Sequence, residues 1–122
     1  MVRRLALAAA LAALVCHHTA MAQDRPPVGR QSLVDLAYVL GQSHALRQVC
    51  ESEADMYWRS RMEKLLDVEE PDQAFRARLF QSFATAFNGA RAAFPNCSPA
   101  ARQEASKSAL RGRTLSDSLA SP

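Results

Sequence analysis

The chain has 122 residues, of which 48% are apolar and 22% charged, and its formal net charge at pH 7 is +3. This length is sufficient for one domain with a core of modest size. The small positive charge is not gathered into basic clusters, which argues against a nucleic-acid-binding protein.

The N-terminus has the three parts of a secretory signal peptide. Arg3 and Arg4 supply positive charge, residues 5–16 form an apolar run, and Ala20 and Ala22 are the small residues of a cleavage site. The run is too short for a membrane span, which needs about 20 residues. We therefore predict a signal peptide over residues 1–22, cleavage after Ala22 and a periplasmic location. Cleavage removes two of the 15 basic residues, so that 13 remain against 12 acidic ones.

The three cysteines indicate one disulfide. Cys16 leaves with the signal peptide, and Val15 before it is not the small residue that a lipid-anchor motif requires. Cys50 and Cys97 remain, and two cysteines in an exported chain most simply pair with each other. The alternative is a pair of free or metal-bound thiols, for which the sequence offers no pattern of further ligands.

The mature chain begins with a polar leader and continues as four helices. Residues 23–31 are polar and contain prolines, so we expect a disordered leader. Apolar residues then recur at helical spacing, which predicts one helical domain over residues 32–120. The expected helices span residues 32–50, 56–69, 71–94 and 99–119. Ser32 and Ser98 are the expected N-caps of the first and last helices.

The third predicted helix carries most of the aromatic core. Its apolar stripe contains four of the five phenylalanines of the chain and is expected to face the other helices. The stripe consists of Phe75, Leu79, Phe83, Phe87, Ala90 and Phe94. Pro71 suits the first helical turn, and Pro95 ends the helix.

Short links between the helices predict an all-α fold, a small four-helix up-down bundle. With alternating helix directions, Cys50 and Cys97 fall at the same end of the bundle, which agrees with the predicted disulfide. Gly41 lies within the first helix, where glycine costs about 1 kcal/mol relative to alanine. We expect another helix to approach closely at this position.

Four residues near the disulfide end form a candidate partner-binding surface: His44, Arg47, Trp58 and Arg59. Arg47 is expected to meet Trp58 or Asp55, either as a cover for the end of the core or as a partner-binding residue. Tryptophan and arginine are enriched among interface hot spots. His44 is the only histidine of the mature chain. A structural role for His44 is favoured over a metal ligand or a catalytic acid–base, because the sequence shows no companion groups for either.

Two further pairs of residues have alternative interpretations. Glu69 and Glu70 resemble the carboxylates of a glycosidase, but adjacent helical residues diverge by about 100°, which argues against that role. Asn88 and Gly89 are poor helix formers and mark either a kink or a contact surface. No catalytic constellation, cofactor motif or metal pattern is evident, so we predict a protein that is not an enzyme and binds no cofactor or metal.

The segments Leu40-Gly41-x-x-His44-x-Leu46-Arg47-x-x-Cys50, Trp58-Arg59-x-x-Met62-x-x-Leu65-x-x-x-Glu69, Phe87-Asn88 and Cys97-x-x-Ala100-Ala101 together form a specific pattern. This pattern resembles a family of small exported, uncharacterised proteins of Gram-negative bacteria, over about residues 33–119. Members of that family usually have Asn-x-Gly-Tyr after the phenylalanine, whereas this chain has Asn88-Gly89-Ala90-Arg91 and lacks the tyrosine. The resemblance implies an exported helical domain and no established activity.

These observations predict a periplasmic helical interaction module that contacts an envelope protein. Neither nucleic-acid binding nor stable membrane insertion after cleavage is expected. The alternative is a small periplasmic chaperone or stress-protection protein, because the predicted architecture is similar to that of the small acid-stress chaperones. Capture of one dominant species or of many unfolded clients would distinguish the two.

Overall fold

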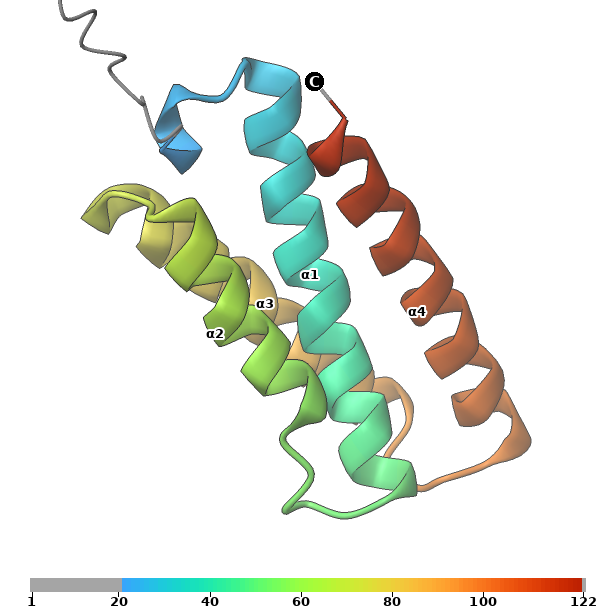
Figure 1. The fold of residues 1–122 in the computed structure, drawn as a ribbon. Helices are drawn as coiled ribbons and strands as arrows, with labels where there is room; N and C mark the ends of the chain where they lie inside the picture. The colour runs from blue at the N-terminus through green and yellow to red at the C-terminus, as the bar shows by residue number, and fades with distance from the viewer. Residues whose placement is uncertain (1–20, 122) are drawn as a thin grey trace, which may run out of the picture.

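The computed structural model describes residues 21–121, and its regular structure in that range is entirely helical. A short 3-10 helix, η1 (Ala22–Asp24), precedes four α-helices (Figure 1). These are α1 (Pro27–Cys50), α2 (Tyr57–Glu69), α3 (Gln73–Ala93) and α4 (Pro99–Ala120). The predicted all-α class with four helices is confirmed. Residues 1–20, which make up most of the predicted signal peptide, lie outside the described residues.

The N-terminal segment differs from the sequence prediction. α1 begins at Pro27, five residues before the predicted start, because proline in the first turn has no N–H that would lack a partner. Ser32 lies within the helix, where its hydroxyl donates to the Val28 carbonyl instead of capping. The structure therefore places residues 23–24 in η1 and residues 27–31 in α1, within the segment 23–31 where we expected a disordered leader.

The starts of α3 and α4 follow the capping rules. Asp72 precedes α3 and accepts the Phe75 N–H at 2.8 Å, which places Pro71 just outside the helix. Ser98 accepts the Ala101 N–H at 3.1 Å, and Pro99 is the first residue of α4, as predicted. α2 ends at Glu69, and the C-cap residue Glu70 has a left-handed backbone with a φ of 45°. The links are short, and the chain direction alternates from each helix to the next (Figure 1).

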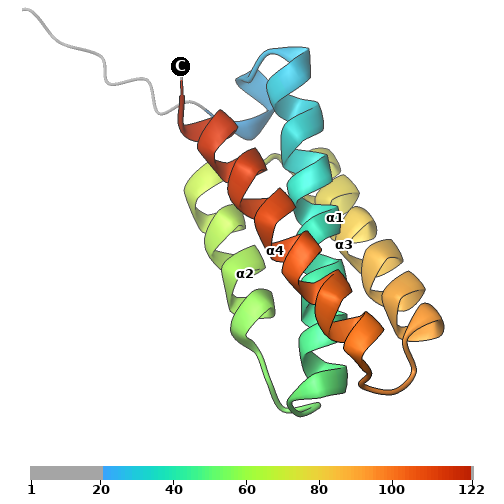
Figure 2. The ribbon, with the colours of Figure 1, turned by 90° about the vertical axis from the view of Figure 1, so that its right-hand side faces the viewer.

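α1 is the central helix of the bundle. It packs against α2, α3 and α4. Figure 2 shows α4 in front of α1, with α2 and α3 on either side. The predicted stripe of α3 supplies Phe75, Leu79 and Phe83 to the buried core, while Phe87 and Phe94 are half-buried. The main core cluster also includes Leu33, Leu36, Leu40, Met62 and Leu66.

Gly41 is the point of closest approach between α1 and α3. A Cβ atom added at Gly41 would lie 2.8 Å from the carbonyl carbon of Phe83, 2.9 Å from its Cα and even closer to its carbonyl oxygen. Only glycine leaves room for the backbone of α3 at this distance. The close helix approach expected at Gly41 is confirmed.

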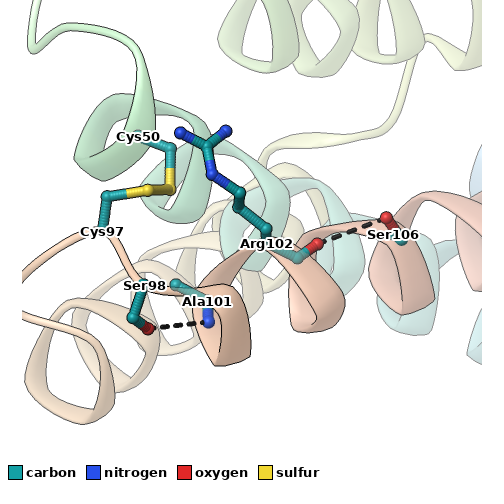
Figure 3. Close-up of a disulfide and its surroundings, with 6 residues drawn as sticks. All are labelled: Cys50, Cys97, Ser98, Ala101, Arg102 and Ser106. Atoms are coloured by element: carbon teal, nitrogen blue, oxygen red, sulfur yellow. Dashed lines mark hydrogen bonds between the residues drawn. A yellow bond between two sulfur atoms is a disulfide. The ribbon is translucent and has the colours of Figure 1, made fainter.

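The predicted disulfide joins the end of α1 to the segment between α3 and α4 (Figure 3). Cys50 and Cys97 are bonded, with their Cα atoms 4.8 Å apart. At the other end of the bundle, Arg25 donates to both carboxylate oxygens of Glu69, at 2.7 and 2.9 Å, and to the Leu119 carbonyl at 3.3 Å. The two ends are thus closed by a covalent bond and by an ion pair.

Candidate functional site

The structure divides the four candidate partner-binding residues between two hollows. His44 and Arg59 line a pocket against α3, whereas Arg47 and Trp58 line a hollow against α4. Trp58 and Arg59 are consecutive on α2, so their side chains diverge by about 100° and face different neighbours. The predicted single surface is therefore replaced by two separate ones.

Arg47 is held by residues at the start of α2. Its Nε donates to Asp55 at 2.8 Å, and its guanidinium carbon lies 4.8 Å from the centre of the Tyr57 ring. The predicted contact with Asp55 is confirmed, but the aromatic partner is Tyr57 instead of Trp58. The hydrogen bond from Arg47 lowers the pKa of Asp55. Asp55 also accepts the Tyr57 N–H at 3.1 Å, so it orients both Arg47 and the first turn of α2.

Two adjacent hollows, which share two lining residues, lie along a groove between α2 and α4 and have residues of α1 as their floor. Their volumes are about 560 and 340 Å³, and Trp58 and Ala109 line both. We call this feature the α2/α4 groove. Its floor is apolar and includes Leu36, Val39 and Leu40. Near the disulfide, Arg102 reaches from α4 toward Cys50 (Figure 3).

The groove exists because the inner face of α4 is made of small residues. Small side chains let α4 lie close to α1, and a Cβ atom at Gly112 would be 3.3 Å from Val39. The same small side chains of α4 do not fill the space between α4 and α2. The small residues of α4 that line the groove are Ala105, Ser106, Ala109, Gly112 and Ser116.

The charged residues that line the groove are mostly basic. Among the described lining residues, Glu51 is the single acidic side chain. The basic ones are Arg47, Arg61, Lys64, Arg102 and Arg113. Because the whole chain has a formal net charge of only +3, this is a local concentration of positive charge over an apolar floor.

A second, smaller pocket lies among α1, α2 and α3. Its volume is about 220 Å³, and we call it the His44 pocket. It is lined by His44, Arg59, Phe80, Phe83, Ala84, Phe87 and Asn88. The His44 ring is packed against two of these aromatic rings, with centroids 5.8 Å from Phe83 and 5.3 Å from Phe87.

Two polar atoms at the His44 pocket are buried without a hydrogen-bond partner within residues 21–121. They are Nδ1 of His44 and Nε of Arg59. His44 is only 5% exposed. Burial, followed by the positive charge of Arg59, lowers the pKa of His44, so the imidazole is neutral at neutral pH. The predicted structural histidine is indeed buried, but no residue in the described range 21–121 provides the hydrogen bond at Nδ1 that would be expected for such a role.

A family model matches residues 29–122, which include all four helices except the first two residues of α1. The chain belongs to the DUF2385 family. That family is described as a protein of unknown function, in agreement with the resemblance in the sequence. Comparisons with curated proteins and with solved structures found no match.

In this DUF2385 chain, the two adjacent glutamates lie in different surroundings. Glu69 is 6% exposed and is paired with Arg25, whereas Glu70 is exposed at the end of α2. They do not form a carboxylate pair. Sequence reasoning missed Arg25, because it lay in the expected leader. The signal was the position of Glu69, which follows Leu65 and Leu66 at helical spacing and so lies on the apolar face of the second predicted helix. A buried carboxylate requires a cation nearby.

Asn88 and Gly89 cause no break in α3, which is continuous from Gln73 to Ala93. Asn88 lines the His44 pocket, and no described atom lies within 4 Å of a Cβ added at Gly89.

Within residues 21–121, no cluster of three or more His, Cys, Asp and Glu side chains is arranged to hold a metal. None of the helices described for this DUF2385 chain is both long and apolar enough to cross a bilayer.

Proposed function

We propose that the protein is an exported interaction module that binds an acidic amphipathic helix of an envelope protein in the α2/α4 groove. The observation that carries this proposal is the charge of the groove, where five basic side chains and one acidic side chain surround an apolar floor. Arg47 is paired with Asp55, so the positive charge comes mainly from the other four: Arg61, Lys64, Arg102 and Arg113. A helix with an apolar face and acidic flanks is complementary to such a surface. The proposed role is binding and not catalysis.

The dimensions of the groove suit a helix of about four turns. Along α4, the groove extends from Arg102 to Ser116, which corresponds to about 21 Å at 1.5 Å per residue. Leu36, Val39 and Leu40 would meet the apolar side chains of the bound helix, while Arg61, Lys64 and Arg113 would meet its acidic flanks. Trp58 lies where the two halves of the groove join.

Export to the periplasm is part of the proposal. It is supported by the signal-peptide pattern of residues 1–22 and by the Cys50–Cys97 disulfide, since disulfides persist in oxidising compartments. An envelope protein is therefore the expected partner.

The groove can be tested with a model peptide, because the only tryptophan of the chain lines it. We expect a helical peptide with a leucine face and glutamate flanks to change the Trp58 fluorescence in a saturable manner, and added salt to weaken binding. Arg113→Glu should weaken it about fivefold or more. Arg111→Glu is the matched control, because Arg111 lies on the same helix but faces away from the groove. Equal weakening by both variants, or equal binding of a lysine-flanked peptide, would overturn the proposal.

The natural partner can be identified by cross-linking in cells. A photoreactive residue at Ser116, inside the groove, should yield one dominant adduct that disappears with Arg113→Glu, whereas the same residue at the exposed Leu110 should not yield it. Many adducts of unfolded proteins at Ser116 would instead support the chaperone alternative and would contradict a dedicated partner.

A further inference from the structure

Tyr57 lies on the α2 wall of the α2/α4 groove, next to Trp58. It is 44% exposed, and its ring packs edge-on against the Trp58 indole, with the ring centroids 4.9 Å apart. The guanidinium carbons of Arg47 and Arg61 lie 4.8 and 4.9 Å from the centre of the Tyr57 ring. Arg47 lines the half of the groove near the disulfide, and Arg61 lines the other half. One tyrosine therefore contacts a basic residue of each half.

The hydroxyl group of Tyr57 holds the guanidinium of Arg61 in place. Nη2 of Arg61 donates to this hydroxyl at 2.8 Å, and the two residues lie four positions apart on α2. Among residues 21–121, the hydroxyl is the only hydrogen-bond partner of the Arg61 side chain, and a guanidinium has five N–H groups. The direction of Arg61 is thus fixed, while most of its donors are unused. Arg47 differs, because Asp55 already neutralises it.

The other basic residues of this half are not held in the same way. Lys64 and Arg113 are exposed, and their side chains form no hydrogen bond or ion pair with a described residue. A long side chain without a partner loses its rotamer freedom when it binds, whereas Arg61 has already lost part of it. A guanidinium also pairs with a carboxylate through two parallel N–H···O bonds, while an ammonium acts as a point charge. Arg61 is therefore the residue of this half that is best prepared to recognise one carboxylate.

We propose that Tyr57 is a positioning residue of the α2/α4 groove, which orients Arg61 to bind one carboxylate side chain of the partner helix. This inference rests on the proposed groove binding and adds the source of its specificity. The partner helix carries a glutamate or aspartate opposite Arg61, whereas the positions of its other acidic residues are less restricted. Tyr57 acts through Arg61 and does not pair with the partner's carboxylate itself.

Tyr57→Phe isolates the hydrogen bond to Arg61, because it removes the hydroxyl group and keeps the ring. Tyr57 is exposed, so Tm should stay within about 4 °C. Binding of the helical peptide with a leucine face and glutamate flanks should weaken about three- to tenfold. Isothermal titration calorimetry is the suitable measurement, because a change at Tyr57 also alters the surroundings of the Trp58 fluorophore.

Double variants show whether Tyr57 acts through Arg61. In an Arg61→Gln background, Tyr57→Phe should cause no further loss of affinity, because the residue that it orients is absent. Lys64→Gln is the matched control background, since Lys64 lies on the same wall of the groove but forms no hydrogen bond with Tyr57. In that background, Tyr57→Phe should keep its full effect.

Two kinds of failure are distinguishable. Unchanged affinity in Tyr57→Phe, or an equal loss of affinity with and without Arg61, would overturn the positioning role and leave the groove binding intact. No binding of the peptide to the unmodified protein would overturn the groove binding and the positioning role together.

Discussion

Replacement of Gly41 by alanine is the sharpest test of how α1 and α3 pack. Alanine favours the helix by about 1 kcal/mol over glycine. Against this gain, its Cβ would lie 2.8 to 2.9 Å from backbone atoms of Phe83, where carbon atoms in ordinary contact are about 3.5–4.0 Å apart. The obstacle is backbone and not a flexible side chain, so the two helices must separate by about 1 Å and loosen the core around Phe83.

We expect the clash to outweigh the gain. Overpacking of a core typically costs 1–3 kcal/mol and occasionally more, and helix separation is at the upper end of that range. The net loss of about 2 kcal/mol corresponds to a fall in Tm of about 8–16 °C for a domain of this size. Thermal unfolding followed by circular dichroism measures this directly.

Gly89→Ala is the matched control for Gly41→Ala. Gly89 lies in α3, is exposed, and has no described atom within 4 Å of an added Cβ. The helix propensity of alanine then acts alone and should raise Tm by about 4–8 °C. The two Gly→Ala variants should therefore shift Tm in opposite directions. A rise in Tm for Gly41→Ala would refute the close crossing of α1 and α3.

Three further predictions concern the disulfide, the buried histidine and the ion pair. Reduction of Cys50–Cys97, which are 47 residues apart, should cost about 4 kcal/mol and lower Tm by more than about 10 °C; an unchanged Tm would show that the bond does not constrain the unfolded chain. Because the pKa of folded His44 is lowered, the unfolded chain binds a proton that the folded chain does not. Stability should therefore fall as the pH drops below about 6.5, by at most about 1.4 kcal/mol per pH unit, and His44→Gln should be less pH-sensitive between pH 7.5 and 5.5. Arg25→Ala should lower the free energy of unfolding by about 1–3 kcal/mol, since it leaves the Glu69 carboxylate buried without a cation, and Glu69→Gln in the same chain should recover part of that loss in denaturant titrations.

Much of the helical organisation was determined by local sequence. Apolar residues at helical spacing, together with capping residues such as Ser98, depend only on neighbours a few positions away, and they placed α2, α3 and α4 to within two residues. The pairing of Cys50 with Cys97 also followed from the sequence, because the alternating helix directions bring these residues to one end. Gly41 was expected to mark a close helix approach for the same local reason, the cost of glycine within a helix.

The start of α1 was decided by tertiary structure. Ser32 and Pro27 are both acceptable helix starts by local rules. The structure extends α1 to Pro27, and Arg25 just before it pairs with Glu69, which is 44 residues away in the chain. No local pattern contains that partner, so the sequence predicted a disordered leader instead.

The division of the four candidate residues between the α2/α4 groove and the His44 pocket also required the tertiary structure. The sequence identified His44, Arg47, Trp58 and Arg59 as candidates, but it could not assign them to neighbours, because helical spacing gives the direction of a side chain and not the helix that it meets. The central position of α1 separates these residues, with α3 on one side and α4 on the other. Which helix faces meet depends on packing across the whole chain. One example is the space beside Trp58, which exists because the residues of α4 there are small.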